Sequence, residues 1–111
     1  MNVAKMTGSE KQINWAENII TAPYNRLNAL ANTEDRLAKA DGKETTEKAT
    51  LIRKAMEEYE SQYNSVADQL SKASTVIDIR ARFSGMAKAI VKDIMQDAGH
   101  PEWTLDIIIN L

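Results

Sequence analysis

An unbroken heptad pattern between positions 49 and 73 constrains the fold of this chain more than any other feature. Its apolar residues alternate at intervals of three and four: Ala49, Ile52, Met56, Tyr59, Tyr63, Val66, Leu70 and Ala73. This spacing places one apolar stripe along an α-helix, and other helices must cover such a stripe to keep it from water. We therefore predict a helix over 46–73, with Thr45 or Thr46 as its cap.

Tyr59 and Tyr63 lie in the middle of this stripe. Their rings suit the core of a helical bundle, where each hydroxyl needs a hydrogen-bond partner. The alternative is that the stripe forms a seam with a second copy of the chain or with another protein. We expect both rings to face the bundle core.

The first 40 residues predict a helical arm over 9–40 that is broken at Pro23. Ser9 and Gln12 have the spacing of a capping box, which predicts that the arm begins at Ser9. Pro23 cannot donate a backbone hydrogen bond, so we expect it to end or kink one helix and to begin another. Asp41 and Gly42 then form a stop-and-turn signal.

A third helical arm is predicted over 75–98. Apolar residues at helical spacing supply its buried face: Val76, Ile79, Phe83, Met86, Ile90 and Ile94. Gly99 followed by Pro101 signals the end of this helix. Because the arms have similar lengths and short connections, we expect an all-α protein, an antiparallel three-arm helical bundle that forms a single domain over residues 1–111.

The C-terminal tail, residues 101–111, allows two interpretations. Apolar side chains occupy alternate positions in it: Trp103, Leu105, Ile107, Ile109 and Leu111. This alternation is typical of a strand, whereas Pro101 and Glu102 favour the first turn of a helix. We expect a terminus with this many apolar side chains to be covered, either by its own bundle or by a partner. The five alternating residues are therefore the candidate partner interface.

The residue types exclude most kinds of catalytic and metal chemistry. The chain has no cysteine, and His100 is its only histidine. His100 lies between Gly99 and Pro101, where a turn residue or a cation near a helix C-terminus is a simpler interpretation than a general base or a metal ligand. No glycine-rich phosphate loop occurs in the sequence. We therefore expect no enzymatic activity, no cofactor and no metal site.

The charge balance gives little support for binding to nucleic acid or to membranes. Fourteen basic and sixteen acidic residues give a net charge of −2. The most basic stretch is the predicted helix over 75–98, whose candidate basic surface consists of Arg80, Arg82, Lys88 and Lys92. No apolar run approaches the ~20 residues that span a bilayer, and no apolar signal-peptide segment follows the N-terminus. We expect neither nucleic acid nor a membrane as a partner.

Residues 7–19, TGSEKQINWAENI, resemble the N-terminal motif GSEKQ-I-x-W-A-x-x-I of small uncharacterised proteins from phages and mobile elements of Gram-positive bacteria. Members of this group often carry a second signature, W-I-D-x-R. Residues 76–80, VIDIR, match its Ile, Asp and Arg but have valine in place of tryptophan. The resemblance implies a source and no activity, so it assigns no functional residues. In physical terms, the motif caps the first helix and places Trp15 to anchor it to the bundle, over the segment 76–80.

Small size, the lack of chemical motifs and the resemblance together predict a protein that acts by binding. Our first hypothesis is a non-catalytic protein-binding module of a phage or mobile element, such as an inhibitor of a host defence nuclease of the anti-CRISPR kind. Its partner would be a host or phage protein, with a second copy of the chain as an alternative. The second hypothesis is a small nucleic-acid-binding or regulatory protein that uses the helix over 75–98. We expect a cytoplasmic location, in the host cell if the protein is phage-encoded.

Overall fold

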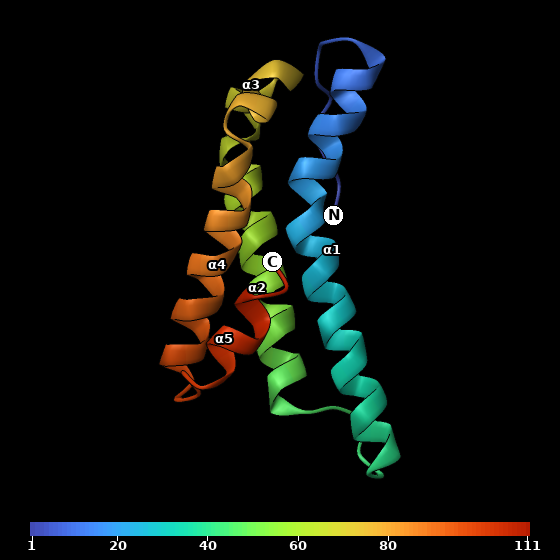
Figure 1. The fold of residues 1–111 in the computed structure, drawn as a ribbon, viewed down its shortest axis with the longest axis vertical. Helices are drawn as coiled ribbons and strands as arrows, with labels where there is room; N and C mark the ends of the chain where they lie inside the picture. Colours follow the sequence, from blue (N-terminus) through green and yellow to red (C-terminus); the bar gives the residue numbers. More distant parts are fainter.

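The protein is entirely helical in a computed structural model that describes all 111 residues, which confirms the predicted all-α class. Its elements in chain order are α1 (Glu10–Ala40), α2 (Glu47–Val66), the short 3₁₀ helix η1 (Ala67–Leu70), α3 (Ala73–Asp78), α4 (Arg80–Asp97) and α5 (Trp103–Ile108). Figure 1 shows the chain descending along α1, returning along α2 and descending again along α4. The molecule is elongated, with extents of 48 × 25 × 21 Å.

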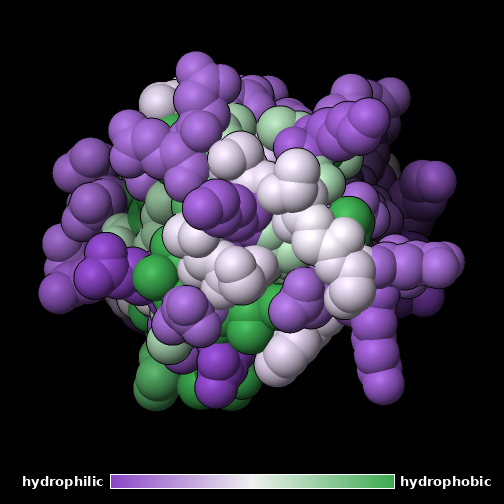
Figure 2. Space-filling view, turned by 90° about the horizontal axis from the view of Figure 1, so that it is seen from above, coloured by the Kyte–Doolittle hydropathy of each residue, from purple (hydrophilic) through white to green (hydrophobic).

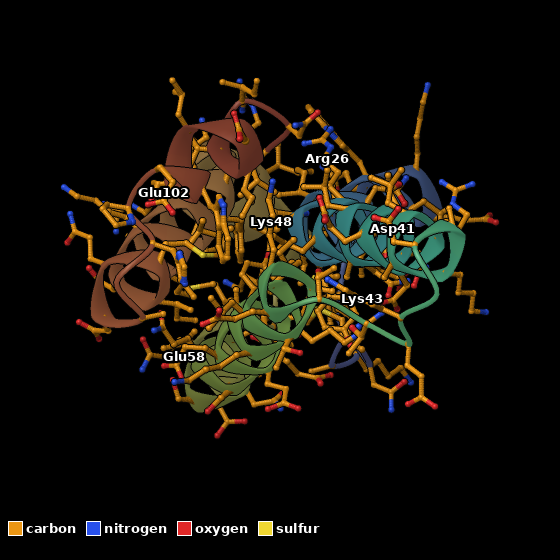
Figure 3. The ribbon with its side chains drawn as sticks, turned by 90° about the horizontal axis from the view of Figure 1, so that it is seen from below. Arg26, Asp41, Lys43, Lys48, Glu58 and Glu102 are labelled. Atoms are coloured by element: carbon orange, nitrogen blue, oxygen red, sulfur yellow. The ribbon has the colours of Figure 1, made fainter.

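The core lies between the long helices and is divided into two clusters. Seen from below in Figure 3, α1, α2 and α4 lie on three sides of a shared interior, and α5 lies across the opening between α1 and α4. Twelve buried residues from these four helices form one cluster. Nine others, from the N-terminal segment, α1, α2, η1, α3 and α4, form the second.

Two helices begin where local signals in the sequence place them. The amide of Gln12 donates to the hydroxyl of Ser9, and the amide of Ser9 donates to the side-chain carbonyl of Gln12, both at 3.2 Å. This completes the predicted capping box. At the start of α2, the amide of Ala49 donates to the hydroxyl of Thr46 at 3.1 Å, so Thr46 is the cap.

Pro23 does not break the first arm, and this prediction was wrong. α1 continues through it from Glu10 to Ala40. A proline inside a helix removes one backbone donor and crowds the preceding turn. Two side chains add hydrogen bonds to the same stretch of α1: the hydroxyl of Tyr59 donates to the carbonyl of Ile20, and the hydroxyl of Thr21 donates to that of Glu17 at 2.9 Å. Pro23 is itself buried, so packing against the core offsets the local cost.

The helix predicted over 46–73 is shorter than its heptad pattern suggests. α2 ends at Val66, and the N-terminal segment crosses the chain just beyond. The amide of Thr7 donates to the carbonyl of Ser71 at 2.8 Å, and the amide of Ala73 donates to the carbonyl of Thr7 at 2.9 Å. Because Ala73 is bonded to Thr7, its amide is not available to continue a helix from α2.

The arm predicted over 75–98 is divided at Ile79 into α3 and α4. At the junction, the guanidinium of Arg80 donates to the backbone carbonyl of Ile77 at 2.9 Å. The predicted apolar face of this arm is still directed toward the core in both α3 and α4. Val76, Phe83, Ile90 and Ile94 are buried, while Ile79 and Met86 are partly buried.

The C-terminal tail folds as a helix, so the strand interpretation was wrong. Gly99 adopts a φ of 79°, and the amide of His100 turns back to the carbonyl of Met95 at 2.8 Å, ending α4 as predicted. The short helix α5 then folds back onto the bundle. No strand lies elsewhere in the chain for the tail to pair with.

Tyr59 and Tyr63 both face the core, as predicted, and are 0% and 1% exposed. The hydroxyl of Tyr59 donates to the carbonyl of Ile20, and the hydroxyl of Tyr63 accepts a hydrogen bond from the amide of Ala4 at 2.9 Å. Burial raises the pKa of Tyr59 well above its ordinary value, so this hydroxyl keeps its proton and remains a donor. Each tyrosine therefore ties α2 to a different part of the chain.

Candidate functional site

The helical conformation of the tail divides the candidate partner interface into two faces. Two residues along an α-helix correspond to a rotation of about 200°, so alternating side chains point to opposite sides. On the inner side, Ile107 is 1% exposed, and Trp103 and Leu111 pack partly buried against the core. On the outer side, Leu105 and Ile109 are 69% and 72% exposed. Only these last two remain as an exposed apolar pair.

Polar contacts tie α5 to the helices beneath it. The guanidinium of Arg26 in α1 donates to the carbonyl of Leu111 at 3.1 Å. The ammonium of Lys48 in α2 lies 3.6 Å from the carboxylate of Glu34 and 3.9 Å from that of Asp106. Figure 3 shows Lys48 near the middle of this end of the molecule. Contacts from both α1 and α2 thus fix the position of α5, whose outer face remains exposed.

The space-filling view in Figure 2 shows that apolar residues are unevenly distributed over one end of the molecule. Figure 2 looks onto the end that carries α3, which is largely covered by polar and near-neutral residues. Apolar atoms gather at the lower edge of that view, which is the side turned toward the viewer in Figure 1. α5 lies on this same side of the molecule.

His100 connects the turn before α5 to the start of α2 and is not a free turn residue. Its ring stacks on the ring of Trp103, with centroids 3.8 Å apart and planes inclined by 7°. Its Nδ1 lies 3.0 Å from the carboxylate of Glu102, and its Nε2 lies 3.2 Å from that of Glu47. The hydrogen bond to Glu102, with the negative charges of both carboxylates, raises the pKa of His100, and the same bond lowers the pKa of Glu102.

These shifts predict a pH dependence of stability. Because the folded pKa of His100 lies above its unfolded value of about 6.5, its contribution is complete below that pH and disappears as pH rises through the folded pKa. We expect the difference in melting temperature between the native protein and the His100→Gln variant to shrink from about pH 6 to about pH 8.5. A difference that stayed constant or grew over this range, measured by circular dichroism, would contradict the assignment.

The four residues of the candidate basic surface differ in the contacts that they make. Arg80 bends back over its own chain, where it donates to Ile77 and lies 5.9 Å from the ring centre of Trp15. Arg82 instead borders an apolar cavity between α2, η1 and α4. Lys88 and Lys92 form no ion pair with the acidic side chains of the chain.

Trp15 is 51% exposed, so it anchors α1 less completely than its position in the motif suggested. Its ring does meet the segment 76–80 through Arg80, at a distance suited to a cation–π contact. The deeper anchoring of this part of α1 comes from Ala16 and Ile20, both 0% exposed. Trp15 therefore serves as a cover over the junction of α3 and α4.

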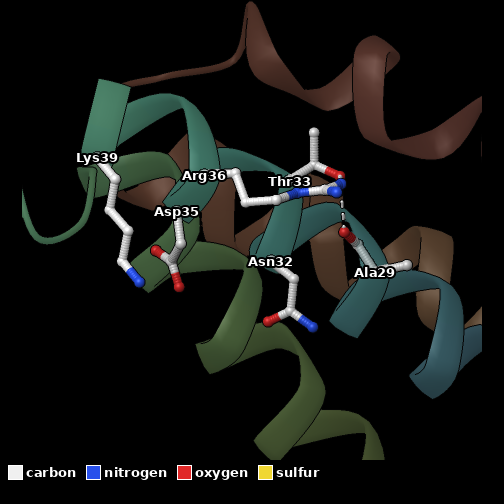
Figure 4. A pocket seen from close by; sticks show the side chains of 6 residues that line it. All are labelled: Ala29, Asn32, Thr33, Asp35, Arg36 and Lys39. Carbon is white, nitrogen blue, oxygen red and sulfur yellow. Dashed lines mark hydrogen bonds between the residues drawn. The ribbon is translucent and has the colours of Figure 1, made fainter. Parts of the chain in front are cut away.

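A surface hollow of about 570 Å³ lies along α1 and is shown in Figure 4. All six lining residues belong to this one helix: Ala29, Asn32, Thr33, Asp35, Arg36 and Lys39. Two of its three charged groups have partners within the chain, and the third, Lys39, forms no ion pair. Asp35 pairs with Arg53 and accepts from the hydroxyl of Thr45 at 2.8 Å, and Arg36 donates to Thr33 at 3.1 Å. The bonds from Arg53 and Thr45 lower the pKa of Asp35, so these residues link α1 to α2 and leave no convergent groups for chemistry.

No three or more His, Asp or Glu side chains lie together in an arrangement that could hold a metal ion. None of the helices combines the length and apolar character needed to cross a membrane. In comparisons with known proteins, no family model matches this chain, and neither a curated protein nor a solved structure matches it.

Proposed function

We propose that this protein acts without catalysis, by binding another protein through the outer face of α5. The observation that carries the proposal is the exposed apolar pair Leu105 and Ile109, 69% and 72% exposed on a helix whose other face is packed against the core. Ile109 is the C-cap of α5 and has helical backbone angles, so it lies on the same side as Leu105, four residues earlier. This spacing is that of the anchors by which one helix contacts a partner.

The contacts beneath α5 favour binding because they order the helix before a partner arrives. Association costs less when the interface is ordered in advance. Arg26, Lys48 and His100 connect the tail to α1 and α2. We infer that α1, α2 and α4 act as the arms of an antiparallel three-arm bundle, with α5 mounted on it as the recognition element.

The proposed source rests on the motif in residues 7–19, and the proposed kind of partner is inferred from that source together with the lack of chemical motifs. Its resemblance to phage and mobile-element proteins supports a role in protecting such an element from the defences of its host. Within that role we propose an inhibitor that binds a host defence nuclease, of the anti-CRISPR kind. A second copy of the chain is the alternative occupant of the α5 surface.

The test compares two sets of surface substitutions in the full chain. The double variant Leu105→Ser/Ile109→Ser alters the outer face of α5, and Leu37→Ser, on a residue of α1 that is 58% exposed, is the matched control. All three proteins should melt within a few degrees of one another, because surface changes shift stability by about 0.5 kcal/mol or less. Phage plating is measured in hosts that carry nuclease-based defences, and sedimentation reports self-association.

We expect the native protein and Leu37→Ser to restore plating against one such defence, and the double variant to lose this protection. Equal protection by all three proteins would place the interface elsewhere. A native dimer that the double variant abolishes would instead assign α5 to self-association. Failure of the native protein against every defence tested would contradict the inhibitor role.

A further inference from the structure

A second apolar feature lies at the other end of α2, away from α5. A cavity of about 240 Å³ opens between the end of α2, η1 and the first turns of α4. Apolar side chains form most of its lining: Tyr63, Val66, Leu70, Ile79, Phe83 and Met86. The two polar residues that border it are Gln69 and Arg82.

The cavity exists because the heptad stripe is interrupted at this point. α2 ends at Val66, and η1 carries the chain away before Leu70 becomes buried again. Val66 is the one member of the stripe that is exposed, at 38%. An apolar position in line with the core stripe is thus left uncovered within the cavity wall.

The charges at the cavity indicate what covers it. Arg82 forms no ion pair with any acidic residue of the chain, although Arg80, two positions earlier, is engaged with its own backbone. A guanidinium presents several donors suited to a carboxylate. The cavity therefore combines an apolar hollow with an unpaired cation at its border.

The size of the cavity points to one side chain. Sites for drug-sized ligands and cofactors usually enclose roughly 300 to 1,000 Å³, more than the 240 Å³ present here. A single large apolar side chain such as phenylalanine or leucine suits this volume. Anchors of this kind, set in a pocket, carry much of the energy of protein interfaces.

We propose that this cavity binds one large apolar side chain of a protein partner, and that an acidic residue next to it in the partner pairs with Arg82. The inference rests on the proposed function as a protein-binding module, but it assigns a second contact made of residues different from Leu105 and Ile109. The partner segment is thus an acidic peptide with an apolar anchor.

Three capped dipeptides test the proposal by NMR titration of the ¹⁵N-labelled full chain: acetyl-Phe-Asp-amide, acetyl-Phe-Asn-amide and acetyl-Ala-Asp-amide. We expect the Phe-Asp probe to shift amide signals of η1 and the first turns of α4. The Ala-Asp probe should bind more than tenfold more weakly, because it lacks the ring that fills the cavity. The Phe-Asn probe should bind up to about fivefold more weakly, as expected for loss of an exposed ion pair.

Protein variants separate the two parts of the proposal. Arg82→Gln should remove the preference for Phe-Asp over Phe-Asn, whereas Arg80→Gln should keep it. Val66→Phe should fill the hollow and prevent binding of all probes. Because Val66 is already 38% exposed, this change should leave the melting temperature nearly unchanged, which separates blocked binding from unfolding.

Several results would overturn the proposal. These are no shifts with the Phe-Asp probe, shifts confined to other helices, or an Asp preference that survives in Arg82→Gln. Binding of octanoate at these residues without binding of Phe-Asp would assign the cavity to a small carboxylate instead. The Leu105→Ser/Ile109→Ser variant should bind the probes like the native protein, so failure of the α5 surface and failure of this cavity are distinguishable.

Discussion

Replacing Tyr59 by alanine is expected to lower the free energy of unfolding by about 4 kcal/mol, in the range of large-to-small aromatic substitutions in cores. The ring is 0% exposed and lies in the larger core cluster, so its removal leaves a cavity between α1, α2 and α4. The substitution also removes the hydroxyl that donates to the carbonyl of Ile20, near the proline in α1. Urea denaturation followed by circular dichroism measures the change.

Two further variants separate the ring of Tyr59 from its hydroxyl. Tyr59→Phe keeps the ring and should cost about 0.5 to 1.5 kcal/mol, because it removes one buried hydrogen bond to the carbonyl of Ile20. Tyr63→Ala should cost on the order of 3 kcal/mol, since that ring is 1% exposed. A change below about 0.5 kcal/mol in either alanine variant, with an unchanged m value, would place that ring outside the core.

Replacing Ile107 by alanine is expected to lower the free energy of unfolding by about 3 kcal/mol, although it lies only four positions before Leu111. The reason is that Ile107 is 1% exposed and belongs to the larger core cluster, which joins α5 to α1, α2 and α4. Thermal and urea melts of the full chain measure the loss.

Leu105→Ala is the matched control on the same helix. Leu105 is 69% exposed, so its truncation should change stability by about 0.5 kcal/mol or less. Equal losses from the two substitutions would show that the tail does not present the two faces described. A negligible loss for Ile107→Ala would mean that α5 contributes little to the core.

The candidate site was only partly accessible to sequence reasoning. The tail was predicted as a candidate interface, but its alternating apolar residues favoured a strand while Pro101 and Glu102 favoured a helix. The cavity beside Arg82 was missed because the heptad pattern continues through Val66 as if α2 did not end there. The signal that marks it, an exposed apolar residue within an otherwise buried stripe, becomes visible only once burial is known.

The sequence by itself determined the all-helical class, the capped start of α1 at Ser9, a cap for α2 at Thr45 or Thr46, and the stop at Gly99. These features depend on periodicity and on hydrogen bonds between residues three or four positions apart, which the local sequence contains. The burial of Tyr59 and Tyr63 followed from the same periodicity.

Only the tertiary structure decided that α1 continues through Pro23, that α2 stops at Val66, and that the tail is a helix with one face free. Each outcome depends on groups that are distant in the sequence. The hydroxyl of Tyr59 reaches a carbonyl 39 positions away, and Arg26 reaches the carbonyl of Leu111 across 85 positions. Local propensity for these segments was ambiguous or opposed to the observed conformation, and long-range packing and hydrogen bonding were strong enough to select it.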